Sequence, residues 1–552
     1  MTADAARAEA PGRAGVASRA LRNPLRAAGV AWRRMRASLS ERARGRADAR
    51  FLRRATEIAS LRTRPEPSET VVAFCHSGFL RHGGAHALLA RRLAQRGALP
   101  LFLLDDIAPP PLADPALRAV EGSLRRRSRT VYERRGAARP TRSWNVDLAR
   151  GQAVVEGIDF GPALLGALRR DFRCYRPDFA DPAVQREIGA LVSSADAALD
   201  ACLALRETAR GGRRVRLVAS ELNYVPGGIF NVFCAEAGAR EGMAFVDFGD
   251  AYAHFFTVGA APGVFFQARN ITRGGGVSRL DVDRAAFEAW LARGVDAGPA
   301  RAEADAILRQ DRTAAGELPA EAAAVLERVR EHRRRGGKVA CVFGHLTFDL
   351  GGLRDDGPAH RDMADWLEDT LAALAGSSTL VLVKPHVDEG RYKANRAPLQ
   401  LLAELVRASR ADNVMWLDPL WFNAHQLFPH LDAGIVWRSS VALELTIPGI
   451  PCVVAGRESY YREAMNLASP ADRADYRRIL AELPGRAVAP SESARAALLL
   501  KYIPEQTFLS LPYVERDGGP TGSFRWNEAA LARLLAEGDP DIDRACDVML
   551  AP

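Results

Sequence analysis

The clearest pattern in the chain is a series of short apolar runs in its second half, separated by amphipathic segments. The mainly apolar runs lie at residues 336–344, 379–383, 414–417, 433–437 and 451–456. Between them, apolar residues recur at helical spacing over residues 362–376, 397–409, 421–430 and 440–447. Short runs without polar alternation are typical of strands buried on both faces of a parallel sheet. This half therefore predicts a doubly wound, Rossmann-like α/β domain.

A similar but weaker alternation occupies the first half. Mainly apolar strands are predicted at residues 71–77, 99–106, 215–221 and 243–250, and a helix before the second of these ends at Gly97. Strand, glycine-containing loop, helix and strand form a βαβ unit. The periodicity is weak over residues 105–215, which are expected to be helical with loops. Two Rossmann-like domains facing a cleft are the predicted fold class, α/β throughout.

The pattern changes at both ends and suggests four segments. We predict a basic arm and linker over 1–66, a first Rossmann-like domain over 67–300, a second over 301–490, and a helical extension over 491–552. Within the arm, Asn23 and Pro24 form a helix-start signal, and apolar residues then repeat at helical spacing among arginines. Three alternatives follow: the arm docks on the protein's own body, it is partly disordered, or residues 20–55 contact an anionic membrane surface.

Composition narrows the class of protein. The 552 residues carry a formal net charge of +9, but most of the excess lies in the arm, so nucleic-acid binding is not expected. The seven cysteines are scattered without metal-ligand spacing and suit a reducing compartment. No apolar stretch of about 18 residues or more stands out, which argues against a membrane-spanning helix. A cytoplasmic protein is expected, with peripheral attachment to the inner face of the cell membrane as the further option for the arm.

Polar residues follow the predicted strands of the second half where each strand ends. Lys384 and His386 follow the second strand, and Asp418 follows the third. Arg438, Ser439 and Ser440 follow the fourth, and Tyr460 comes after the fifth. The carboxyl ends of parallel strands lie at one edge of a sheet, where ligands of such domains bind. The sequence therefore predicts a nucleotide-phosphate pocket at this edge.

The segment RSSVALE, from Arg438 to Glu444, carries the most specific expectation. Hydroxyl and backbone N–H groups at a helix start suit a phosphate, since the first-turn donors are unpaired and the helix dipole favours an anion. Glu444 lies one turn after Ser440, where its carboxylate can accept both hydroxyls of a ribose. The simpler alternative is a serine N-cap followed by a first-turn glutamate.

The first half offers candidates for proton transfer. Glu221, Asp247 and Asp250 lie at or after predicted strands, and one of them is expected to act as general base toward a sugar hydroxyl. His82 lies at the first strand-to-helix turn, beside Gly83 and Gly84, which permit a close backbone approach. His82 and His86 are four residues apart, but no further ligand is nearby, so no metal site is predicted. This turn lacks the GxGxxG motif of dinucleotide-binding domains, so a dinucleotide cofactor such as NAD is only weakly supported.

Five segments between residues 339 and 480 together resemble the capsule-polysaccharide biosynthesis proteins. The segments are FGHLTFDLG with HRDMADWLEDTLAAL, VLVKPHVDEGRY, WLDPLWFNAHQLF, IVWRSSVALELTIPGIPCVVAGRESYY and SPADRADYRRIL. That family consists of GT-B-type glycosyltransferases and includes the Kdo transferases of capsule export loci. The resemblance implies that the second domain binds a nucleotide-sugar donor and the first binds the acceptor. A CMP-linked sugar is one of the donors that the family suggests. It assigns Lys384, His386, Ser439, Ser440 and Glu444 to the donor.

The sequence thus predicts a metal-independent, GT-B-type glycosyltransferase without a cofactor. Its substrates are expected to be a nucleotide sugar and a cell-surface polysaccharide or glycolipid acceptor. Three alternatives remain: a nucleotide-sugar epimerase or a polyol-phosphate transferase of the same fold, and a non-catalytic scaffold of a polysaccharide assembly complex. The fold alone does not choose among them.

Overall fold

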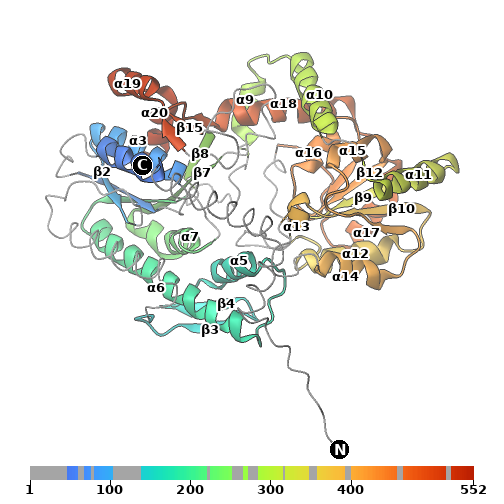
Figure 1. Cartoon of the computed structure of the whole chain (residues 1–552), viewed down its shortest axis with the longest axis horizontal. Coiled ribbons are helices and arrows are strands. Elements are labelled where there is room, and N and C mark those ends of the chain that lie inside the picture. Colours follow the sequence, from blue (N-terminus) through green and yellow to red (C-terminus); the bar gives the residue numbers. More distant parts are fainter. Residues whose placement is uncertain are drawn as a thin grey trace, which may run out of the picture.

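The computed structural model describes residues 47–59, 68–75, 80–103, 139–219, 224–250, 265–270, 282, 284–314, 318–346, 357–391, 400–456, 464–465, 467–516 and 524–551. Within these ranges the chain forms two α/β units, seen on the left and right of Figure 1. Each is built on its own sheet. The prediction of two Rossmann-like α/β domains is therefore confirmed.

The first domain is built on a six-stranded sheet with the order β14-β8-β7-β6-β1-β2. Its strands are β1 (Thr70–Cys75), β2 (Leu99–Phe102), β6 (Arg214–Ala219), β7 (Met243–Asp250), β8 (Phe265–Asn270) and β14 (Leu509–Ser510). Strands β1, β2, β6 and β7 pair in parallel, whereas β8 and β14 add to one edge in antiparallel pairs. Every residue of β1 is buried, as its apolar sequence predicts.

Helices cover both faces of this sheet. They are α3 (Leu80–Gln95), α5 (Gly161–Phe172), α6 (Pro182–Arg210), α7 (Gly227–Phe233), a π-helix (Cys234–Gly238), a 3-10 turn (Ala239–Glu241), α19 (Glu528–Glu537) and α20 (Pro540–Leu550). Residues of α5, α6 and α7 form the core on one face, and residues of α3, α20 and helix 47–59 form the core on the other. The turn after α3 contains Gly97 at a φ of 82°, a conformation that favours glycine.

Two small antiparallel sheets complete the first domain. The three-stranded one contains β3 (Asn145–Asp147), β4 (Gln152–Val155) and β5 (Ile158–Asp159), and the two-stranded one contains β15 (Val514–Arg516) and β16 (Phe524–Trp526). The three-stranded sheet lies in the region expected to be helical with loops, so that expectation was incomplete. Its strands have two to four residues, too few for a periodic signal.

Helix α6 corrects one expectation from the sequence. Its 29 residues include an 18-residue window of mean hydropathy 1.6, so its length and composition alone would allow it to cross a membrane. In the structure 67% of that window is buried, and residues such as Leu199 and Leu205 belong to the core beside the first sheet. The helix therefore serves the core of this domain.

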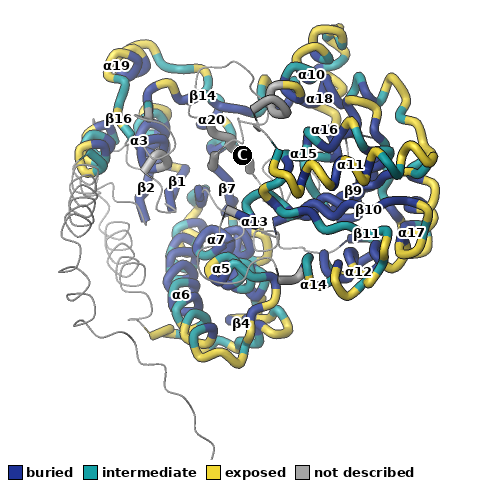
Figure 2. The backbone as a smooth tube through the Cα atoms, turned by 45° about the vertical axis from the view of Figure 1, so that its right-hand side comes forward, coloured by how far each residue is buried: buried dark blue, intermediate teal, exposed yellow. Residues whose placement is uncertain are grey.

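The second domain is built on a five-stranded sheet in which every pairing is parallel. The order is β11-β10-β9-β12-β13, with β9 (Lys338–Phe343), β10 (Thr379–Lys384), β11 (Val414–Trp416), β12 (Ala433–Val436) and β13 (Cys452–Val454). Strand β10 appears as a buried segment in Figure 2, and every residue of β10 and β12 is buried. All five strands coincide with the apolar runs of the sequence.

Helices also cover both faces of the second sheet. They are α9 (Arg284–Leu291), α10 (Ala297–Ala314), α11 (Ala320–Arg334), α12 (Met363–Leu374), α13 (Val387–Arg391), α14 (Gln400–Ser409), α15 (Ala424–Leu427), α16 (Val441–Thr446), α17 (Arg473–Glu482) and α18 (Pro490–Thr507), with 3-10 turns at Phe428–His430 and Leu483–Gly485. Helices α9–α11, α15, α16 and α18 contribute to the core on one face. Helices α12, α14 and α17 contribute to the core on the other.

The chain returns to the first domain near its end. Helix α18 packs against α10 in the second domain, and β14 then pairs with β8 at the edge of the first sheet. Helix α20 packs on α3, where Arg92 Nε lies 2.6 Å from Asp543 Oδ1. Residues 491–552, predicted as a helical extension, are thus divided between the two domains.

The described part of the arm docks on the first domain. Residues 47–59 are helical, and the ring of Phe51 stacks on that of Trp526 with centroids 4.9 Å apart. A Cβ on Gly84 would lie 2.7 Å from Cζ of Phe51. Gly84 therefore permits a close approach, as predicted, but the group that approaches it is the protein's own aromatic ring. The earlier part of the arm, including the helix-start signal at Asn23, lies outside the described residues.

Candidate functional site

The strand order of the second sheet creates a topological switch point. The chain moves from β9 outward to β10 and β11, then crosses to β12 and β13 on the other side of β9. Ligands of such open sheets bind at the carboxyl ends of the two strands beside the switch point. Here those strands are β9, which continues into Gly344 and His345, and β12, which continues into Trp437 and Arg438. His345 was not singled out from the sequence.

Lys384 ends β10 and connects two of the predicted loops. Its Nζ donates hydrogen bonds to Pro385 O at 2.8 Å and to Pro419 O at 3.1 Å, and the residue is buried. Burial lowers the pKa of Lys384 to about 8, with smaller opposing effects from Cys341 and Asp418. These bonds engage two of the three N–H donors of the ammonium group. The ammonium group thus joins the loops that follow β10 and β11.

His386 and Asp418 both shape backbone turns at this edge. Nδ1 of His386 accepts a hydrogen bond from Asp388 N at 3.2 Å at the start of α13, a short helix that was not predicted. The His386 side chain is 37% exposed. Oδ1 of Asp418 accepts from Leu420 N at 2.9 Å, an Asx turn. Both side chains therefore have local structural partners at the predicted edge.

The two serines before α16 differ in their hydrogen bonding. Oγ of Ser439 accepts a hydrogen bond from Val441 N at 3.3 Å. Ser440 is the residue before the helix, yet its side chain makes no capping hydrogen bond. The simple N-cap alternative therefore describes Ser439 better than Ser440. Both residues are partly exposed at the carboxyl end of β12.

Glu444 has a partner that the sequence did not suggest. Its Oε2 lies 2.6 Å from Nε2 of His425, and the side chains of Glu444 and His425 are 9% and 5% exposed. His425 belongs to α15, which starts with a capping box formed by Asn423 and Gln426. The Asn-x-x-Gln spacing is visible in the sequence and marks the start of this helix. Nothing in the sequence indicates the pairing across 19 residues.

The first-domain candidates are only partly placed. Asp247 lies near the carboxyl end of β7 and is 1% exposed, on the strand face that also carries Met243 and Phe245. Asp250 is the last residue of β7 and His82 lies in α3. Glu221 and Tyr460 lie outside the described residues. A general base among these acids therefore stays a prediction.

His86, considered with His82 as a metal ligand, is a core residue. It is fully buried, with its ring 4.9 Å from that of Phe74 and 5.9 Å from that of Phe248. Within the described ranges no group of three or more histidine, cysteine or acidic side chains could hold a metal ion.

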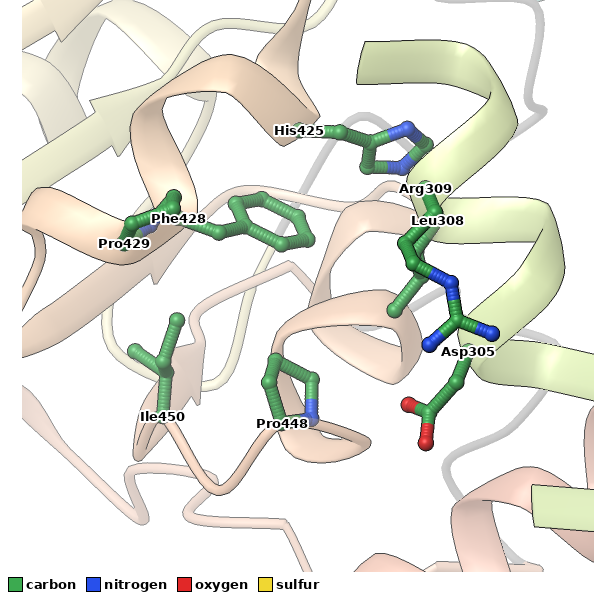
Figure 3. A pocket seen from close by; sticks show the side chains of 8 residues that line it. All are labelled: Asp305, Leu308, Arg309, His425, Phe428, Pro429, Pro448 and Ile450. Atoms are coloured by element: carbon green, nitrogen blue, oxygen red, sulfur yellow. The ribbon is translucent and has the colours of Figure 1, made fainter. Parts of the chain in front are cut away.

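A hollow of about 290 Å³ lies between α10, α15 and the turn after α16. Figure 3 shows its lining residues, Asp305, Leu308, Arg309, His425, Phe428, Pro429, Pro448 and Ile450. Several of them shortly precede β12 or β13, so they lie toward the amino ends of these strands. The hollow is therefore distinct from the edge that carries Lys384 and Ser440. His425 belongs to both surroundings, because it lines the hollow and contacts Glu444.

No family model and no curated protein matches the chain. Among solved structures, it is similar to a protein from Listeria monocytogenes assigned as a UDP-N-acetylglucosamine 2-epimerase, with 12% identity, coverage of 79% of this chain and 94% of the other, and a TM-score of 0.25. It is also similar to CalG4, the calicheamicin glycosyltransferase, with 11% identity, coverage of 88% and 100%, and a TM-score of 0.24. A likeness this weak carries no inference about activity. The two sheets described above establish the fold class by themselves.

Proposed function

We propose that this protein is a metal-independent glycosyltransferase that uses a nucleotide-activated sugar to build a cell-surface polysaccharide or glycolipid. The observation that carries the proposal is the gathering of polar side chains at one edge of a parallel sheet with a switch point. Lys384 ends β10, and Arg438 and Ser440 follow β12, the two strands that flank β9. Glu444 lies one helical turn after Ser440. Cations, hydroxyls and a carboxylate are the groups that phosphate and ribose require.

In the proposed reaction the second domain holds the donor. Lys384, Arg438 and the hydroxyls of Ser439 and Ser440 stabilise the charge that develops on the leaving nucleotide phosphate. Glu444 accepts hydrogen bonds from the ribose hydroxyls. His386 and Asp418 shape the loops around the donor, and Tyr460 is a further donor contact. A group of the first domain, among Glu221, Asp247, Asp250 and His82, removes the proton from the acceptor hydroxyl.

Calorimetry with CMP-, UDP- and GDP-sugars tests the donor site. We expect one nucleotide class to bind, and we expect the Ser439→Ala/Ser440→Ala double variant to bind it at least about tenfold more weakly. Absence of binding by every donor would refute the enzyme proposal and leave the scaffold alternative.

The product identifies the reaction class. Transfer of sugar to an added glycan or glycolipid, with release of the nucleotide, is the expected outcome. An epimerised nucleotide sugar would show an epimerase, and transfer of a polyol phosphate would show the other alternative. Either outcome would contradict the proposed glycosyltransferase activity but would still be consistent with the proposed nucleotide-binding site.

We also propose that the arm holds the enzyme near membrane-bound acceptors at the inner face of the cell membrane. The basic amphipathic pattern of residues 23–39 supports this proposal. Deletion of residues 1–46 should abolish sedimentation with vesicles that contain anionic lipid. Unchanged sedimentation would contradict the proposal. Vesicles of neutral lipid are the control, because they remove the electrostatic attraction.

A further inference from the structure

The pair formed by His425 and Glu444 is held rigidly from the histidine side. The side chain of Asn423 accepts a hydrogen bond from His425 N at 3.1 Å, and Gln426 Oε1 accepts one from Asn423 N at 2.9 Å. The imidazole also packs edge to face on Phe428, with centroids 5.1 Å apart and planes at 76°. Backbone and ring are both fixed, so Nε2 of His425 is directed at Glu444.

The carboxylate of Glu444 is only partly engaged. His425 contacts Oε2 and, among the residues that the structure describes, is the only hydrogen-bond partner of this side chain. Some polar side-chain atoms of the described residues are fully buried and have no hydrogen-bond partner, but Oε1 of Glu444 is not among them. Oε1 therefore retains accessible surface and can accept a hydrogen bond from a ligand.

The backbone places this carboxylate beside the proposed phosphate groups. Glu444 N donates to Ser440 O at 3.1 Å, so the two residues are one helical turn apart on the same side of α16. Phosphate and ribose are neighbouring parts of a nucleotide. One turn of helix therefore carries a group for each of them.

From these contacts we propose that His425 is a positioning residue that directs Glu444 Oε1 toward the ribose hydroxyls. The pair thereby makes the site selective for ribonucleotides over nucleotides that lack these hydroxyls. This inference rests on the proposed function. Without His425, the carboxylate can rotate about its side-chain torsions, and a hydrogen bond to ribose must then also order it.

The hollow in Figure 3 makes the critical variant practicable. His425 lines this hollow, so the space left by His425→Ala opens into an existing cavity that water can enter. The loss of the imidazole therefore does not create a sealed void. His425→Gln supplies a second variant, because a glutamine amide nitrogen can donate to Glu444 from a position close to that of the imidazole Nε2.

The experiment compares the affinity of the full-length protein for CMP, UDP or GDP with that for the matching 2′,3′-dideoxynucleotide. The native protein should bind the ribonucleotide about tenfold or more tightly. The dideoxynucleotide lacks the two hydroxyls that donate hydrogen bonds to the Glu444 carboxylate. His425→Ala should reduce this preference to within about threefold while leaving the dideoxynucleotide affinity unchanged. His425→Gln should restore most of it.

A matched control is another buried histidine–carboxylate pair in the same domain. His360 Nε2 lies 3.0 Å from Asp369 Oδ2, and these side chains are 0% and 3% exposed. His360→Ala should lower the unfolding temperature without changing the ribose preference. Equal preference in native protein and His425→Ala would overturn the inference, and so would a native protein that binds both nucleotides equally. Absence of any nucleotide binding by native protein is the separate result that refutes the proposed function itself.

Discussion

The second domain contains two buried histidine–carboxylate pairs that differ in how completely the carboxylate is used. Asp369 accepts from His360 through Oδ2, while Arg477 donates to its Oδ1 from two nitrogens. Glu444 accepts from His425 through Oε2 alone among the described residues. The first carboxylate ties α12 to α17, and the second ties α16 to α15.

The difference separates a structural network from a binding group. Burial opposes ionisation of Asp369, but the hydrogen bonds from His360 and Arg477 outweigh it and hold its pKa below the ordinary value. Such a carboxylate has little capacity left for a ligand. Glu444 keeps one carboxylate oxygen accessible. Lys384 donates two of its three N–H groups to backbone carbonyls, which leaves the third for a ligand. Unused hydrogen-bonding capacity therefore distinguishes the strand-edge site from the neighbouring network.

The largest effect is expected from Asp369→Ala, which removes the partner of a fully buried histidine. We expect the free energy of unfolding to fall by about 2–3 kcal/mol, as for other buried groups that lose their partner. Chemical denaturation measures this loss. Nucleotide affinity of the folded variant should equal that of the native protein, and a weakened affinity would remove the distinction between the two pairs.

The complementary change is Glu444→Gln, which keeps an oxygen for His425 but removes the negative charge. Nucleotide affinity should fall by about tenfold or more, and the free energy of unfolding should change by less than about 1 kcal/mol. Calorimetry and denaturation on the same preparation give both values. Loss of stability with unchanged affinity would make Glu444 a structural residue like Asp369.

A smaller effect is expected from titration of Lys384, whose pKa is lowered to about 8. As pH rises through about 8, the ammonium loses its proton, so nucleotide affinity should fall by about threefold to tenfold. Stability should change in the opposite direction. Between about pH 8 and 10 the unfolded chain binds more protons at this lysine than the folded one, so its contribution to the free energy of unfolding rises with pH.

Lys384→Met provides the reference for this titration because it removes the titrating group. The difference between native protein and variant isolates the lysine from other groups that change over the same pH range. Identical pH profiles of affinity in the two proteins would show that Lys384 only joins the loops after β10 and β11.

The smallest effects should separate the two serines. Ser439→Ala removes the acceptor for Val441 N and should cost about 0.5–1 kcal/mol of stability. Ser440→Ala removes no capping bond, so stability should change by less than about 0.5 kcal/mol while nucleotide affinity falls by about twofold to fivefold. Thermal unfolding and calorimetry distinguish the two. Equal stability losses would place both hydroxyls in the helix cap.

The strands of the second sheet could be predicted because they are buried on both faces. Residues 380–383, for example, are all apolar, and five such runs in regular alternation with helices leave few other folds. Strand β14 could not be predicted in the same way. It has only two residues, and it becomes a strand because it pairs with β8 more than 200 positions earlier in the chain.

The candidate site was predictable in position but not in its contacts. Lys384, Asp418 and Arg438 follow predicted strands, so sheet geometry alone gathers them at one edge. The bond between His425 and Glu444 depends on how α15 and α16 pack, and no local pattern encodes that. Burial of Asp247 likewise depends on the helices that cover β7. Periodicity gives the face of a strand, but it does not give the accessibility of one side chain.

The return of the chain to the first domain limits how the two domains can move. Polypeptide links them twice, once after β8 and again between α18 and β14. Two domains joined by one linker can rotate relative to each other in any direction. Two linkers restrict the motion mainly to a hinge rotation about the line that joins them. Expression of the first domain alone would also require joining its N-terminal part to residues 508–551. A simple truncation after β8 would leave β8 without its partner β14 and α3 without α20.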